Sequence, residues 1–162
     1  MLIILNSKLN KLNLFCYYFI VFLIMRKYLL LLLLTLFWNC STENFNNNNP
    51  YIPNYGFALE INTDLPAYNS LKFVSNAKFI PNYGARGLIV FNAGNNNFVA
   101  FDAACPNQAL SACSTLSISG INAICGCDNA SYSLFSGQCE GKQYPLKPYR
   151  VEVYGTIIKV YN

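Results

Sequence analysis

The pattern of apolar and polar residues changes near residue 55. From there to the end of the chain, apolar residues alternate with polar ones in short segments bounded by Gly, Pro, Asn or Ser. Alternation with period two is typical of strands that bury one face. The segments that we predict as strands are residues 57–61, 71–73, 77–81, 87–92, 98–102, 115–118, 121–124, 149–154 and 156–161. Since no window of about 12 residues carries a helical apolar stripe, we expect an all-β domain over residues 55–162, a small antiparallel sandwich or barrel.

Two apolar runs precede this domain, over residues 12–24 and 28–38. Each is shorter than the roughly 20 residues that cross a bilayer as a helix. Met25-Arg26-Lys27 precedes the second run, which contains a leucine block and ends just before Cys40. This is the layout of a compact export signal. Its end resembles that of bacterial lipoprotein signals, in which the cysteine becomes the lipidated first residue.

These features predict three segments before the domain. Residues 1–24 are interpreted as an upstream extension and residues 25–39 as a lipoprotein signal peptide. Residues 40–54, rich in Asn and Pro, are predicted to be a flexible tether that begins at the lipidated Cys40. The protein would then be a lipid-anchored membrane protein of a bacterial cell envelope, facing the periplasm or the cell surface. The alternative is one long hydrophobic anchor, bent at Arg26-Lys27.

Charge gives no indication of a nucleic-acid partner. The formal net charge of the chain is +4, but from Cys40 onward seven basic residues face seven acidic ones. The excess positive charge therefore lies in the leader, and the domain has no basic surface of the kind that binds phosphate backbones.

Five cysteines follow Cys40, and four of them lie between Phe101 and Phe135: Cys105, Cys113, Cys125 and Cys127. Disulfides are the usual state of cysteines in an exported domain. Four cysteines allow three pairings, and the residues alone do not choose among them. Cys139 is left over, as a free thiol or as part of a mixed disulfide.

The spacing of two short boxes resembles the signature of the Rieske iron–sulphur family. Cys105-Pro106-Asn107 corresponds to its Cys-x-His box, and Cys125-Gly126-Cys127-Asp128 corresponds to its Cys-x-x-His box after a connector of 17 residues. The segments 131–137 and 145–153 resemble the family's flanking sequences. The resemblance covers residues 57–162 and implies a Rieske-like fold. In the family the two cysteines hold one iron of a [2Fe–2S] cluster and the two histidines hold the other.

The chain departs from this signature at both histidine positions. Asn107 and Asp128 stand there, and the whole chain contains no histidine. A neutral amide is a poor iron ligand, and a carboxylate is a hard oxygen ligand poorly suited to a sulphide-bridged cluster. We therefore predict a Rieske-like domain that has lost its cluster and acts as a binding or structural module with an unidentified envelope partner.

The resemblance also implies a disulfide pairing. The residues at positions 105 and 125 would touch the same iron, so their sulphurs would lie close enough to bond. Cys127 corresponds to an extra cysteine that respiratory Rieske proteins use in a disulfide between the two loops. The implied pairs are Cys105–Cys125 and Cys113–Cys127. Each would stabilise the domain by about 3 kcal/mol in the chain-entropy model.

Three alternatives for the cysteines stay open at the level of the sequence. The first is an electron-transfer protein with an atypical [2Fe–2S] cluster on Cys105 and Cys125, completed by Asp128 or by other cysteines. The second is a four-cysteine zinc site, although Cys-x-Cys is not the usual zinc knuckle. The third is a redox-active dithiol, which would have no nearby base. The same lack of histidine removes the commonest general base, so no catalytic residue is predicted.

Two further groups of residues have structural interpretations. Asp102 and Asp128 flank the cysteine boxes and are expected to cap turns by accepting hydrogen bonds from amides two residues further on. Four tyrosines lie in loops near prolines and glycines and are expected either to form a binding surface or to close the ends of the β core: Tyr51, Tyr55, Tyr68 and Tyr83.

Overall fold

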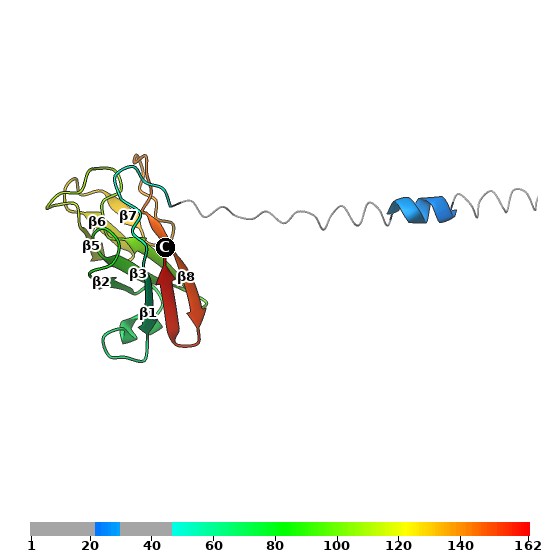
Figure 1. Ribbon diagram of the computed structural model, residues 1–162, viewed down its shortest axis with the longest axis horizontal. Helices are drawn as coiled ribbons and strands as arrows, with labels where there is room; N and C mark the ends of the chain where they lie inside the picture. Colours follow the sequence, from blue (N-terminus) through cyan, green and yellow to red (C-terminus); the bar gives the residue numbers. More distant parts are fainter. Residues whose placement is uncertain (1–21, 30–46) are drawn as a thin grey trace, which may run out of the picture. The chain divides into compact units, whose positions relative to one another are not determined.

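The computed structural model of the protein describes residues 22–29 and 47–162, which belong to two separate units of the chain (Figure 1). Residues 22–29 form a helix of two turns. None of the helices in these two ranges has the length and hydropathy needed to cross a membrane. Most of the predicted leader, including the proposed lipidation site Cys40, lies outside the described residues.

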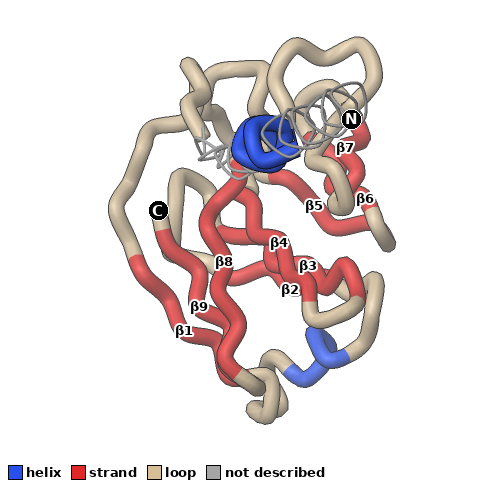
Figure 2. Tube along the Cα trace, turned by 90° about the vertical axis from the view of Figure 1, so that its right-hand side faces the viewer, coloured by secondary structure: helices blue, strands red, loops and turns tan. Residues whose placement is uncertain are grey.

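Residues 47–162 form an all-β domain, as the sequence predicts. It has two antiparallel sheets, one of six strands in the order β1-β9-β8-β4-β3-β2 and one of three in the order β5-β6-β7 (Figure 2). The strands are β1 (Ala58–Asn62), β2 (Ala77–Ile80), β3 (Leu88–Gly94), β4 (Asn97–Asp102), β5 (Leu116–Ser119), β6 (Asn122–Cys125), β7 (Ser131–Ser133), β8 (Pro148–Tyr154) and β9 (Ile157–Tyr161).

Both faces of strand β3 are buried, because the strand lies between the two hydrophobic cores of the domain. Ile89 and Phe91 point into a core shared with the β5-β6-β7 sheet. Leu88 and Val90 point into a second core, which is formed with β1, β8 and β9. All four side chains are fully buried. This two-sided burial explains why the β3 sequence is a continuous apolar run rather than an alternating one.

One predicted strand is wrong, and one strand is missed. The segment 71–73 was expected to be extended, but the structure places a 3-10 helix there, η2 (Asn69–Lys72). Leu71 is buried beneath this turn while Phe73 is exposed, so two apolar residues at spacing two do not share a face. In β7 only Tyr132 is buried, and a three-residue strand with one apolar position has too short a pattern to be recognised.

Residues 47–54 pack against the domain, although the sequence assigned them to the tether. Ile52 is buried, and its carbonyl accepts a hydrogen bond from the Lys147 ammonium at 3.2 Å. The same ammonium donates to the side chain of Asn54. Asn49 donates from its side chain to the Pro106 carbonyl at 2.9 Å. The folded part of the chain therefore extends at least eight residues before the predicted boundary at residue 55.

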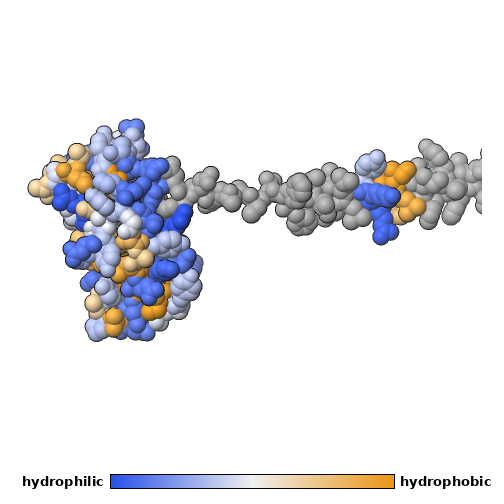
Figure 3. Space-filling view, in the orientation of Figure 1, coloured by the Kyte–Doolittle hydropathy of each residue, from blue (hydrophilic) through white to orange (hydrophobic). Residues whose placement is uncertain are grey.

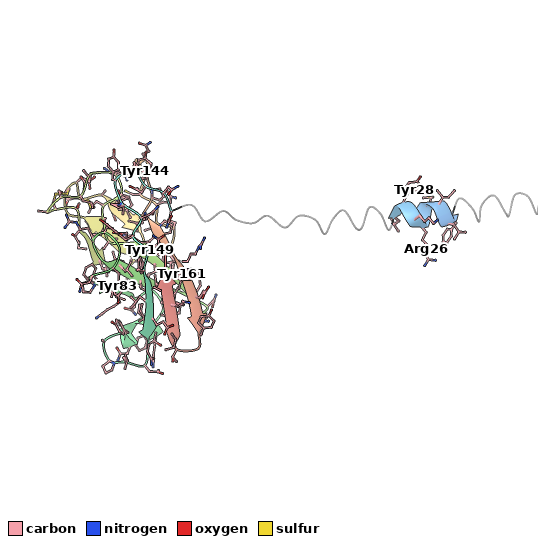
Figure 4. All side chains as sticks on the ribbon, viewed as in Figure 1. Arg26, Tyr28, Tyr83, Tyr144, Tyr149 and Tyr161 are labelled. Atoms are coloured by element: carbon pink, nitrogen blue, oxygen red, sulfur yellow. A yellow bond between two sulfur atoms is a disulfide. The ribbon has the colours of Figure 1, made fainter. Side chains whose placement is uncertain are left out.

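A buried carboxylate joins the sheet to its loops. The Oδ2 atom of Asp102 accepts hydrogen bonds from the Ala85 amide at 2.6 Å and the Tyr149 hydroxyl at 2.7 Å. Tyr149 is labelled in Figure 4. Its Oδ1 atom accepts from the amides of Arg86 at 3.3 Å and Ala104 at 2.8 Å. The bond to Ala104, two residues on, confirms the predicted turn cap. Burial, together with this neighbouring carboxylate, raises the pKa of Tyr149 far above its usual value.

Replacing this carboxylate should be costly. Asp102→Asn removes the charge and turns one acceptor into a donor that faces N–H or O–H groups. We expect the free energy of unfolding to fall by about 3 kcal/mol, since hydrogen bonds to a buried charged group are strong and their loss leaves donors unpaired. Urea denaturation of the oxidised protein measures the change. Glu60→Gln, on the exposed face of β1, is the matched control. Equal stability of the two variants would contradict the role given to Asp102.

Candidate functional site

The candidate site consists of three loops at the β5-β6-β7 end of the domain, the upper end in Figures 1 and 2. We call residues 103–115 the first cysteine loop, residues 126–130 the second cysteine loop and residues 139–147 the closing loop. The first cysteine loop leaves β4 and the second leaves β6. A bridge between Ala104 and Thr115 closes the base of the first loop.

The inner disulfide joins the two positions that correspond to cluster-binding cysteines. Cys105 and Cys125 have their Cα atoms 5.6 Å apart and are bonded to one another. Both are almost completely buried, at 1% and 0% exposure, within the core shared by β3 and the three-stranded sheet. The side-chain amide of Gln108 donates to the Cys125 sulphur at 2.8 Å. No thiolate is left at either position.

The outer disulfide joins the tips of the two cysteine loops. Cys113 and Cys127 have their Cα atoms 4.9 Å apart, and Cys113 is exposed. The Ser111 hydroxyl lies 3.3 Å from one sulphur and 3.5 Å from the other. Gly126 makes the approach possible, because a Cβ atom there would come within 2.8 Å of the Cys113 carbonyl. Both disulfides have the pairing that the family resemblance implies.

The first histidine position of the Rieske resemblance is filled by an amide that makes three hydrogen bonds. Asn107 donates from Nδ2 to the Tyr132 hydroxyl at 3.0 Å and to the Tyr144 carbonyl at 2.7 Å. Its Oδ1 accepts from the Tyr144 amide at 2.9 Å. The side chain thus pairs with the backbone of the closing loop as a neighbouring strand would.

The second histidine position is filled by a carboxylate that binds the same closing loop. Asp128 Oδ2 forms an ion pair with the Lys142 ammonium at 2.7 Å. Its Oδ1 accepts from the Ala130 amide at 3.1 Å, which confirms the predicted turn cap. The hydrogen bond from Lys142 is the main cause that lowers the pKa of Asp128. The same contact raises the pKa of Lys142.

The remaining predicted candidates do not assemble into a chemical site. Cys139 is a free, partly buried thiol that packs against the core shared by β3 and the β5-β6-β7 sheet. Within residues 22–29 and 47–162, no three side chains of His, Cys, Asp or Glu are grouped so that they could hold a metal ion. The four loop tyrosines are split between regions. Tyr51 packs on Tyr144 near the cysteine loops, whereas Tyr83 packs on Phe57 over the second core.

Sequence reasoning missed the partners of the two substituted positions. The closing loop supplies both, through the Lys142 side chain and the Tyr144 backbone. Asn107 binds the backbone of Tyr144, and any residue type would offer the same backbone groups. The sequence therefore could not predict this contact. The opposite charges of Asp128 and Lys142, 14 residues apart, gave only a weak one.

Comparison with known proteins finds similarity only among solved structures. No protein-family model matches the chain, and no curated protein matches it significantly. A chain of the complex of reduced oxygenase and oxidized ferredoxin in carbazole 1,9a-dioxygenase is 19% identical, with 64% of this chain and 92% of that chain covered and a TM-score of 0.44. A putative NADH-dependent nitrite reductase small subunit from Mycobacterium tuberculosis is 13% identical, with 67% and 97% covered and a TM-score of 0.43. The ferredoxin of carbazole 1,9a-dioxygenase from Nocardioides aromaticivorans IC177 is 14% identical, with 56% and 90% covered and a TM-score of 0.38.

The Asp128–Lys142 pair predicts a pH-dependent coupling. Because the pKa of Asp128 is lowered in the folded state, the pair stabilises the protein above the unfolded pKa, near 3.8, and this contribution is lost as the pH falls through the folded pKa. A double-mutant cycle with Asp128→Asn and Lys142→Gln should show coupling in urea denaturation at pH 7 and a smaller coupling at pH 2. The coupling should be small, since both side chains are 32% exposed. The same coupling at both pH values would contradict this assignment.

Proposed function

We propose that the protein is a lipid-anchored envelope protein whose Rieske-like domain has lost its cluster and acts as a disulfide-stapled binding and structural module. One observation carries the proposal. The four positions that correspond to cluster ligands all make bonds within the protein: Cys105 and Cys125 with each other, and Asn107 and Asp128 with the closing loop.

A [2Fe–2S] cluster does not fit the residues present. It needs two thiolates on one iron and two further ligands on the other. Cys105 and Cys125 share a buried disulfide, so releasing them takes two electrons and two protons and opens the core around them. Asn107 would have to give up the Tyr144 backbone, and Asp128 would have to give up Lys142. The electron-transfer alternative therefore requires reduction of the inner disulfide and the loss of at least one further set of contacts, those of Asp128 or of the outer disulfide.

The bonds that replace ligation have a structural use. A cluster cross-links two loops through four ligands. Here two disulfides cross-link the same loops, and Asn107 and Asp128 hold the closing loop against them. In the chain-entropy model each disulfide contributes about 3 kcal/mol, which is a large share of the stability of a small domain. The loops are held rigid without any cofactor, as a surface that binds a partner would need.

The state of the cysteines tests the loss of the cluster. Intact-mass, iron and acid-labile sulphide analysis of the protein purified from an oxidising compartment should give a mass four hydrogens below the reduced value and no stoichiometric iron. The four hydrogens correspond to the two disulfides. In Cys113→Ser/Cys127→Ser the deficit should fall to two hydrogens. Stoichiometric iron and sulphide that disappear in Cys105→Ser would instead establish the electron-transfer alternative.

The lipid anchor has its own test. Metabolic labelling with a radioactive fatty acid should label the wild-type protein and the control Cys139→Ser, in which the free thiol is removed. Cys40→Ser should lose the label and leave the membrane fraction, because lipidation needs the cysteine sulphur. A mature protein that begins at residue 1 with an unmodified amino group would refute the anchor.

A further inference from the structure

A cleft of about 450 Å³ lies between the loop that follows β2 and the first cysteine loop. Its walls include Phe79, Pro81, Tyr83 and Thr115, and Arg86 lies among them. We call it the Arg86 cleft. Its volume is within the range of small-molecule sites. Its exposed lining is mostly polar, and the side chains of Phe79, Pro81 and Tyr83 lie in it together with the Arg86 cation.

The backbone that carries Arg86 is held in place before any ligand arrives. The amides of Ala85 and Arg86 both donate to the buried Asp102 carboxylate. Gly87 has a positive φ, and a Cβ atom there would come within 2.7 Å of the Phe79 ring, so the ring lies directly over this backbone. A preorganised site loses less entropy when a ligand binds.

The Arg86 guanidinium has unused hydrogen-bonding capacity. Its Nη2 donates to the Ser111 carbonyl at 2.6 Å, while its Nε is buried and has no acceptor in the part of the chain that the structure describes. A buried donor without an acceptor is costly. Neither the Lys72–Asp64 nor the Lys142–Asp128 ion pair includes Arg86. The cleft has no acidic residue in its lining.

A second cleft of about 330 Å³, lined by Lys72, Phe98 and Thr156 among others, provides a comparison within the molecule. It also combines a cation with an aromatic ring. There, however, the Lys72 ammonium already binds the Asp64 carboxylate at 2.6 Å. An anion entering the second cleft would have to displace Asp64. The carboxylate nearest the Arg86 cleft is Asp102, which is buried behind the backbone of Ala85 and Arg86 and binds their amides rather than the guanidinium. The two clefts therefore differ in the chemistry that they offer.

We propose that the Arg86 cleft binds a small organic carboxylate with an aromatic or other apolar body. The outer edge of the guanidinium, Nη1 and the second hydrogen of Nη2, offers the carboxylate donors in a planar fork, which is the arrangement that arginine uses for carboxylates. Nε is buried and takes no part in this contact. The body of the ligand packs against Phe79, Pro81 and Tyr83. This inference rests on the proposed binding function, for which it supplies a ligand class.

The first experiment varies the ligand and leaves the protein unaltered. Benzoate, benzamide, acetate and inorganic phosphate are titrated into the full-length, disulfide-oxidised protein in detergent micelles, and amide chemical shifts are followed by NMR. Benzoate should shift the amides of residues 79–87 and Thr115. Benzamide lacks the charge and acetate lacks the ring, so each should bind roughly tenfold more weakly or worse. Benzamide or phosphate binding as tightly as benzoate, or shifts confined to the second cleft, would overturn the proposal.

The second experiment varies the protein. Arg86→Gln should weaken benzoate binding by roughly tenfold or more, since it removes a charge-assisted bidentate contact. Lys78→Gln is the matched control, because it removes the same charge from β2 at a residue outside the cleft lining. Unchanged benzoate affinity in a folded Arg86→Gln variant would overturn the assignment. If this variant fails to fold, the ligand series above decides alone.

The two proposals fail separately. Iron, sulphide and mass analysis on the same preparation reports on the cluster. Iron-free protein with two disulfides and no affinity for benzoate would refute only the Arg86 cleft. Iron-loaded protein that binds benzoate would refute only the loss of the cluster.

Discussion

The buried carboxylate of Asp102 organises this domain. The Asp102 carboxylate is completely removed from solvent, and such a group is stable only when its acceptor capacity is filled. Its four hydrogen bonds come from the loop before β3, the start of the first cysteine loop and the β8 tyrosine, while Asp102 itself ends β4. These bonds hold β8 against β4, fix Ala104 beside Cys105 of the inner disulfide, and fix the backbone of Ala85 and Arg86 in the Arg86 cleft.

The cysteine loops illustrate how one architecture can be held by different chemistry. Two disulfides hold them together. The inner one, Cys105–Cys125, is enclosed in the core, and the outer one, Cys113–Cys127, joins the loop tips at the surface. Asn107 and Asp128 make polar contacts instead, and both side chains bind residues of the closing loop. The surface around them is mostly hydrophilic, with hydrophobic residues in small separate patches on the face drawn in Figure 3. Rigidity here comes from cross-links within the chain.

Sequence patterns predicted the parts of the fold that depend on local order. The β3 run, the turns at Gly94 and Gly155 and the caps at Asp102 and Asp128 all follow from residue type and spacing. The 3-10 turn at Leu71 and the strand at Tyr132 did not, because their burial is decided by neighbours distant in the chain. The docking of Ile52 was missed for the same reason: its partner, Lys147, is 95 residues away. The Arg86 cleft likewise joins residues that only the folded chain brings together.

The contact between Asn49 and Pro106 has a geometric consequence. It fixes the start of the folded domain beside the first cysteine loop. If Cys40 carries the lipid, as proposed, six residues separate it from Asn47, and the seven Cα–Cα steps between them span at most about 25 Å. The first cysteine loop, which Asn49 contacts, would then stay within about that distance of the headgroups, so a partner of this loop would be met close to the bilayer surface.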